Sequence, residues 1–189
     1  MIGLFGGAFD PPHRGHVELA RRAKEELGLG KLLVLVSARP GHKDVATPAN
    51  VRLRLAQVAF PDDDVVLDDH ARTIELLEAH PEWTDPVFLV GADEFCDFAS
   101  WVRPNDVLAR ARLAVGTRPG FPRERLESVL RRLDRPERVL FFDVDPQAVA
   151  SRDLRSRLEA GEDVGGEMPS AVASMIEREM LYGRGTGVH

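Results

Sequence analysis

The sequence predicts an α/β protein built on a Rossmann-like open parallel sheet with helices on both faces. Short apolar runs of strand length alternate with helix-period segments from one end of the chain to the other, a pattern typical of repeated strand–helix–strand units. The run KLLVLVS at Lys31–Ser37 is almost continuously apolar, as expected of a parallel strand that is covered on both faces. No internal repeat or low-complexity linker divides the 189 residues. We therefore expect a single domain over residues 1–182 and a frayed tail over residues 183–189.

The first half of the chain alternates three predicted strands with three predicted helices. Ala20, Ala23 and Leu27 recur at helical spacing along one face of the first helix. Gly28 and Gly30 then end this helix. The strands are expected at Ile2–Phe5, Lys31–Ser37 and Val65–Leu67, and the helices near His16–Leu27, Asn50–Ala59 and Arg72–Ala79.

The second half continues the alternation after an aromatic-rich stretch, Phe95–Trp101. Its strands are expected at Val87–Val90, Leu113–Gly116 and Val139–Phe142, and its helices near Asn105–Arg110, Arg123–Leu133, Ser151–Ala160 and Pro169–Glu179. In an open parallel sheet, ligands bind beyond the carboxyl ends of the strands, where the strand order reverses. The candidate binding loops are therefore those that follow Phe5, Ser37, Val90 and Gly116.

Charge and composition exclude several classes of function. The net charge is −6, from 25 Lys and Arg against 31 Asp and Glu, so long-range attraction to nucleic acid or to an anionic membrane is not expected. No run of about eighteen apolar residues is present, and the single cysteine, Cys96, has no partner for an internal disulfide. We expect a soluble, cytoplasmic protein. No Cys/His cluster has zinc spacing and no tight carboxylate cage is visible, so no resident metal site is expected. The sequence leaves open whether the chain forms a homo-oligomer.

The loop after the first strand carries the most specific chemical signal. It runs from Gly6 to His16 as GGAFDPPHRGH, which is neither the dinucleotide fingerprint G-x-G-x-x-G nor a P-loop. Glycines next to the start of a helix allow the backbone to approach a phosphate. Two histidines that flank Gly15 can reach the same phosphate and offset charge that develops on it. The alternative is a capped helix start with one buried and one surface histidine.

This loop also resembles a known family. The segment Gly7–His16 contains intact the motif G-x-F-D-P-x-H-x-G-H, which opens the nucleotidyltransferases that carry an HxGH or TxGH element. Within that superfamily the chain most resembles the bacterial nicotinate-nucleotide (nicotinamide-nucleotide) adenylyltransferases. The resemblance implies the nucleotidyltransferase fold and transfer of AMP from ATP to nicotinate mononucleotide, giving deamido-NAD and pyrophosphate. It assigns catalytic roles to His13 and His16, and places Gly6, Gly7, Phe9 and Asp10 at the ATP phosphates.

Two further segments extend the resemblance. Pro40-Gly41-His42-Lys43, followed by Arg52, is similar to the family's P-P-H-K loop and its downstream arginine. Lys43 would then contact phosphate, and the alternative is a solvated loop lysine. Arg72-Thr73-Ile74-Glu75-Leu76-Leu77 resembles Y-T-[IV]-[DE]-T-L, with Leu76 in place of the second threonine. Thr73 is expected at the mononucleotide.

The segment Gly91–Trp101 resembles the family's G-x-D…W element. Gly91 and Asp93 are expected at the ATP side, where Asp93 can accept hydrogen bonds from ribose hydroxyls, and Trp101 can stack on a pyridine ring. The alternatives are an aspartate that caps the next helix and a tryptophan that only packs in the core. Arg118 lies in a segment similar to the family's R-P-G turn and is assigned to the mononucleotide, or else to the turn surface.

The last match, Val149–Arg155, departs most from the family pattern I-S-S-T-x-[IL]-R. Ser151 remains as a candidate N-cap, Asp153 would lie in the first turn, and Arg155 is present; Ser151 and Arg155 are expected at the triphosphate. Ala150 and Arg152 replace a serine and a threonine, which removes two hydroxyls.

The sequence leaves several alternatives to this enzyme. The partners expected are ATP and a pyridine mononucleotide, with Mg²⁺ carried in by ATP. One alternative is a transferase of the same fold that acts on nicotinamide mononucleotide or on another phosphate acceptor. A nucleotide-binding protein that has lost catalysis and a purely structural α/β domain are the others. Discrimination between the acid and the amide is expected to depend on backbone amides near Thr73 and Trp101.

Overall fold

Six parallel strands form one sheet in the computed structural model, which describes residues 2–41 and 45–183. Their order across the sheet is β3-β2-β1-β4-β5-β6. The predicted Rossmann-like α/β fold is therefore confirmed, with every neighbouring pair of strands parallel. The strands are β1 (Gly3–Gly7), β2 (Leu32–Ser37), β3 (Asp64–Asp68), β4 (Val87–Gly91), β5 (Arg112–Thr117) and β6 (Val139–Asp143).

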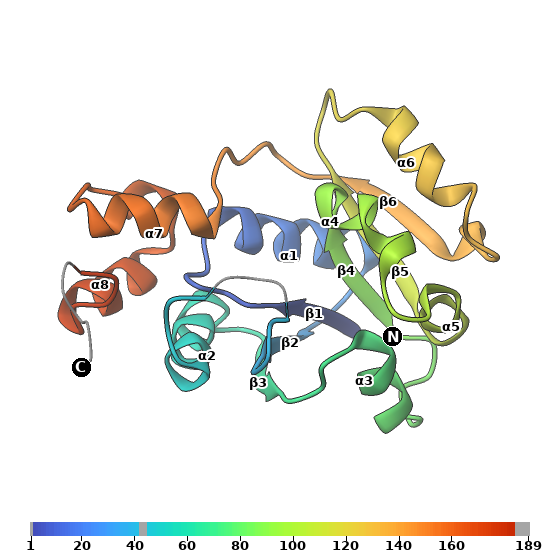
Figure 1. Cartoon of the computed structure of the whole chain (residues 1–189), viewed down its shortest axis with the longest axis horizontal. Helices are drawn as coiled ribbons and strands as arrows, with labels where there is room; N and C mark the ends of the chain where they lie inside the picture. The colour runs from blue at the N-terminus through green and yellow to red at the C-terminus, as the bar shows by residue number, and fades with distance from the viewer. Residues whose placement is uncertain (1, 42–44, 184–189) are drawn as a thin grey trace.

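Helices cover both faces of the sheet, because successive strand side chains point to opposite sides. In β1, for example, Phe5 packs with α1, α2, α7 and α8, whereas Leu4 packs with α3 to α6. Figure 1 shows α7 and α8 at the opposite end of the molecule from α6 and β6. The α-helices are α1 (Arg14–Leu27), α2 (Ala49–Ala59), α3 (Thr73–Ala79), α4 (Ala92–Cys96), α5 (Pro104–Arg110), α6 (Arg123–Leu130), α7 (Ser151–Glu159) and α8 (Ser170–Arg178), and short 3₁₀ helices span η1 (Phe98–Ser100), η2 (Pro136–Arg138) and η3 (Gly165–Glu167). Among the described residues, no helix is long and apolar enough to cross a membrane.

The first strand and helix differ from the predicted bounds. The strand runs on through Gly6 and Gly7, which pair with Leu35 and Val36 of β2, although two adjacent glycines suggested a turn. Gly7 is suited to this position because a Cβ on it would lie 2.8 Å from the Phe9 ring. Helix α1 begins at Arg14 rather than near His16. The loop between β1 and α1 is therefore shorter than the sequence indicated.

The sheet opens between its two central strands. β1 pairs with β4 only from Gly3 to Phe5. Beyond that point β1 stays paired with β2 as far as Gly7, and β4 stays paired with β5 as far as Gly91. The carboxyl ends of the two strands therefore diverge at the position where the strand order reverses, which is where ligands bind in this class of sheet.

A buried carboxylate ties the β1–α1 loop to distant parts of the chain. Asp10 is 1% exposed. Its Oδ1 accepts hydrogen bonds from the hydroxyls of Thr47, at 2.5 Å, and Tyr182, at 2.7 Å, and its Oδ2 accepts from the Ala46 N–H at 2.5 Å. Burial, followed by the nearby Asp10 charge, raises the pKa of the Tyr182 phenol, so this hydroxyl stays a donor. The segment after α8 is thereby joined to the first loop.

A buried guanidinium makes a second tie. Arg52 is 1% exposed and donates to three backbone carbonyls, those of Ser37 at 2.7 Å, Ala8 at 2.9 Å and Thr47 at 3.2 Å. Burial lowers the pKa of Arg52, and the charge of Asp10 opposes that shift. The ends of β1 and β2 and the start of α2 are thus held by one side chain.

Replacing Tyr182 with phenylalanine tests the hydrogen bond between Tyr182 and Asp10. Tyr182→Phe keeps the buried ring and removes only the hydroxyl that donates to Asp10, and a hydrogen bond to a charged group contributes roughly 1.5–3 kcal/mol. We expect the free energy of unfolding, measured by urea denaturation, to fall by about that amount. An unchanged value would show that the hydroxyl does not stabilise the loop.

Candidate active site

Two cavities open at the carboxyl edge of the sheet, on either side of the split between β1 and β4. Their volumes are about 850 Å³ and about 700 Å³, and we call them the first and the second cavity. Both are lined by Gly6, Gly7, Ala8, Asp93 and Glu94. The two cavities are therefore the ends of one crevice, and these five residues form the shared wall between them.

Two helices point their N-termini into the second cavity. His13 and His16 line it from the start of α1, and Ser151, Arg152 and Arg155 line it from α7. Helices of 14 and 9 residues each present unpaired N–H groups and a partial positive charge at this end. The second cavity is thus suited to a polyphosphate.

The two histidines are stacked at the mouth of α1. Their ring centroids lie 3.8 Å apart with an interplanar angle of 29°. The Nδ1 of His16 accepts a hydrogen bond from the His13 backbone N–H at 3.2 Å, which leaves the ring proton of His16 on Nε2. A Cβ on Gly15 would lie only 3.1 Å from the His13 ring, so a larger residue there would crowd the pair. The histidines both shape the helix start and line the second cavity.

His13 is an unsatisfied group in a buried place. Its side chain is 8% exposed, and its Nδ1 has no hydrogen-bond partner among the described residues. Burial lowers the pKa of His13 to about 4, so the imidazole is neutral near pH 7. A buried polar atom without a partner costs about 1–3 kcal/mol.

Asp10 and Phe9, both predicted at the phosphates, turn their side chains into the protein. The oxygens of Asp10 are taken by protein donors, and the Phe9 ring packs edge-on against Phe5 and Phe60. Phe9 has a φ of 50°, an uncommon backbone state for a residue with a Cβ. The backbone of this loop lines the second cavity while its side chains anchor it.

Helix α7 is attached to the same loop. The Ser151 hydroxyl donates to the Pro11 carbonyl at 2.9 Å, and Arg155 Nη1 donates to the Asp10 carbonyl at 2.8 Å. The prediction that Ser151 is the N-cap is wrong, because Ala150 holds that position and the serine side chain is turned toward the loop. Asp153 lies in the first turn, as predicted. Ser151 and Arg155 therefore brace the loop from the far side of the second cavity.

Asp93 stands on the shared wall with its side chain 72% exposed. It lies in the first turn of α4 but makes no capping hydrogen bond, and the N-cap is Gly91. Arg118 and Arg125 approach its carboxylate at 3.9 and 3.8 Å, long exposed pairs that contribute little to stability. Arg118 was assigned to the mononucleotide with Thr73 and Trp101, but it lines the second cavity and they line the first.

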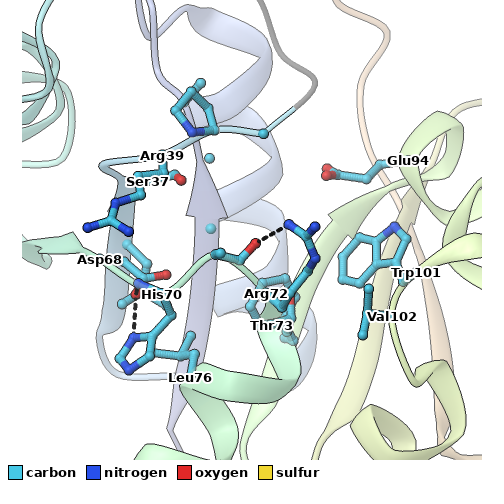
Figure 2. Close-up of a pocket in the computed structure, with 18 of the residues that line it drawn as sticks. Ser37, Arg39, Asp68, His70, Arg72, Thr73, Leu76, Glu94, Trp101 and Val102 are labelled. Carbon is cyan, nitrogen blue, oxygen red and sulfur yellow. Dashed lines mark hydrogen bonds and ion pairs between the residues drawn. The ribbon is translucent and has the colours of Figure 1, made fainter.

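The first cavity brings together Thr73 and Trp101 from distant segments, as shown in Figure 2. Thr73 is the first residue of α3. Trp101 packs edge-on against Phe98 at 5.1 Å and Phe88 at 6.2 Å and also lines the cavity. Core packing and a cavity-facing ring, which the sequence posed as alternatives, therefore coexist in this side chain.

Sequence reasoning missed six charged or titratable side chains of the first cavity. The Nδ1 of His70 lies 2.7 Å from Asp68 Oδ1, and the Arg72 guanidinium faces the cavity beside α3 (Figure 2). Arg39 and His70 follow the carboxyl ends of β2 and β3, so the strand-end rule could have found them. Lys43, predicted to contact phosphate, lies outside the described residues. The missed side chains are Arg39, Asp68, His70, Arg72, Glu94 and Asp97.

Burial of His13 predicts a pH dependence of stability. Its pKa is about 4 in the folded chain against an ordinary 6.5, so the unfolded chain takes up the proton first as pH falls. The free energy of unfolding should therefore decrease between pH 6.5 and 4, by up to roughly 3 kcal/mol, and be unaffected by this group above pH 6.5.

Urea denaturation of the wild type and His13→Gln across that range measures this effect, because all other groups titrate in both proteins. The difference in unfolding free energy between the two should depend on pH below 6.5. Parallel curves for the two proteins would contradict the burial of a neutral His13.

Known proteins resemble this chain over most of its length. Residues 4–157 match the cytidylyltransferase-like family. A probable nicotinate-nucleotide adenylyltransferase of Thermomicrobium roseum is 33% identical, with 96% of this chain and 91% of that protein covered. One of Thermus thermophilus is 32% identical, with 96% and 98% covered.

A solved structure shares the fold. The Plasmodium falciparum nicotinic acid mononucleotide adenylyltransferase complexed with NaAD has a TM-score of 0.74 at 18% identity, with 96% of each chain covered. The chain belongs to the cytidylyltransferase-like family and, within it, to the nicotinate-nucleotide adenylyltransferases.

Proposed function

We propose that the protein transfers AMP from ATP to nicotinate mononucleotide, releasing pyrophosphate and forming deamido-NAD. The names of its relatives support this reaction. The observation that carries it is the pair of cavities joined at one wall, with the stacked histidines lining the second cavity alone. ATP then occupies the second cavity and the mononucleotide the first.

The reaction is an in-line displacement at phosphorus. A phosphate oxygen of the mononucleotide attacks the α-phosphorus of ATP, and the bond to the bridging oxygen breaks, with its electron pair leaving on pyrophosphate. The nucleophile is already an anion, so no general base is required. Catalysis then depends on alignment of the two phosphates and on stabilisation of the charge that develops during transfer.

The histidines are suited to stabilising the charge that develops during transfer. The Nε2–H of His16 is a donor whose orientation is set by the hydrogen bond to its Nδ1, and His13 lines the same cavity. Both would contact the ATP phosphates. The backbone of Gly6 and Gly7 would let the reacting phosphates approach the shared wall, with Asp93 at a ribose.

Magnesium enters this proposal as part of the substrate MgATP. Among the described residues, no three His, Cys, Asp or Glu side chains come together in a way that could hold a metal ion. Mg²⁺ typically keeps several waters and binds through substrate phosphates. We therefore assign its coordination mainly to ATP and water.

The direct test is to incubate the purified protein with MgATP and either nicotinate or nicotinamide mononucleotide, and to follow pyrophosphate. We expect pyrophosphate and deamido-NAD with the acid. Phosphopantetheine serves as a control acceptor. Release of pyrophosphate with that acceptor alone, or with none of the three, would overturn the proposal.

His16→Ala should lower kcat by roughly 10²- to 10³-fold, the scale for losing one transition-state donor. His80→Ala is the matched control, because His80 stacks on Trp83 and lines neither cavity. Steady-state kinetics with both substrates measures the effect. A kcat for His16→Ala equal to that of His80→Ala would remove His16 from the mechanism.

Trp101→Ala should mainly raise the KM for the mononucleotide, since the indole lines the first cavity and ATP is assigned to the second. The other tryptophan, Trp83, lies outside both cavities and gives the control Trp83→Ala. Equal KM values in the two variants would mean that Trp101 serves packing alone.

A further inference from the structure

We propose that Arg72 is a specificity residue that binds the carboxylate on the pyridine ring of the mononucleotide and thereby favours the acid over the amide. The inference rests on the proposed function, because it takes the first cavity to be the mononucleotide site. It concerns a side chain that departs from the family pattern, in which a tyrosine precedes the threonine that corresponds to Thr73.

The position of the substrate follows from the shape of the crevice. The phosphate of the mononucleotide must lie at the shared wall, because it attacks ATP in the second cavity. Its pyridine ring then lies away from that wall, beside Thr73 and Trp101. Arg72 directly precedes Thr73 as the N-cap residue of α3, so it stands at the pyridine end.

The Arg72 guanidinium is available to a ligand. It donates one hydrogen bond, from Nη1 to the Ala71 carbonyl at 2.9 Å, and among the described residues it forms no ion pair with a carboxylate. In Figure 2 it lies on the Trp101 side of the cavity, whereas Arg39 lies on the opposite side near Asp68. A guanidinium carries five N–H donors in a planar fork that matches a carboxylate.

The charge of the cavity gives this contact its selectivity. Four acidic side chains, Asp68, Asp93, Glu94 and Asp97, line the same cavity. A ring carboxylate is therefore attracted by Arg72 and repelled by these four carboxylates. The carboxamide of the amide substrate has no charge, and its NH₂ group cannot pair with guanidinium donors. Arg72 thus strengthens binding of the acid much more than binding of the amide.

Binding measured without ATP tests Arg72 independently of turnover. Dissociation constants for nicotinate and nicotinamide mononucleotide are measured by calorimetry for the wild type, Arg72→Gln, Arg72→Lys and Arg39→Gln. We expect Arg72→Gln to weaken binding of the acid by roughly 10- to 100-fold, the scale of a charge-assisted hydrogen bond, and binding of the amide by less than about 3-fold. Arg72→Lys should retain part of the preference, and Arg39→Gln should leave the acid-to-amide ratio unchanged.

The outcomes separate the two proposals. A preference for the acid that is lost in Arg72→Gln supports the role of Arg72, even in a protein that releases no pyrophosphate. Equal weakening of both mononucleotides, or no change in either, would overturn it while leaving turnover to decide the function. Failure of the wild type to bind either mononucleotide would overturn both.

Discussion

The site depends on the buried carboxylate of Asp10. Three protein donors converge on its two oxygens, and they come from the segment before α2 and from Tyr182 near the end of the described chain. A buried charge is costly unless it is paired and hydrogen-bonded. Buried Arg52 and Arg155 donate hydrogen bonds to backbone carbonyls of the same loop and supply charge opposite to that of Asp10. These residues thus fix the path of the chain from β1 into α1, and with it the two histidines.

The crevice itself comes from the sheet. β1 and β4 separate after Phe5 and Leu89 because each continues its ladder with its outer neighbour. The gap places one cavity on each side of a wall made of small residues and two acidic side chains. The geometry distinguishes the two cavities: the stacked histidines and the N-termini of α1 and α7 line one, and the Trp101 ring with Arg39 and Arg72 lines the other. A reaction that joins two phosphates needs such an arrangement.

The fold was predictable because each strand was a short apolar run, and the intact motif identified the loop that carries the histidines. The sequence could not show the direction in which each side chain points. Asp10 belongs to the motif, yet its side chain points inward, and Ser151 is one position inside its helix and bonds to Pro11. Arg118 follows β5 and Trp101 comes after the neighbouring strand β4, but the two residues line different cavities. Residue type and spacing identify a group that can bind phosphate, whereas only packing decides which way it faces.

His13 shows how stability and site chemistry are linked. The Asp10 network holds the loop so that the imidazole is buried with one nitrogen unsatisfied, and this burial keeps it neutral at physiological pH. Without a ligand, the free energy of unfolding would be higher if this nitrogen were exposed or replaced. In the proposed complex with ATP, the charge of the polyphosphate in the second cavity would oppose the desolvation that lowers the His13 pKa. The effect of burial on His13 would thus be offset at the place where the proposed reaction develops charge.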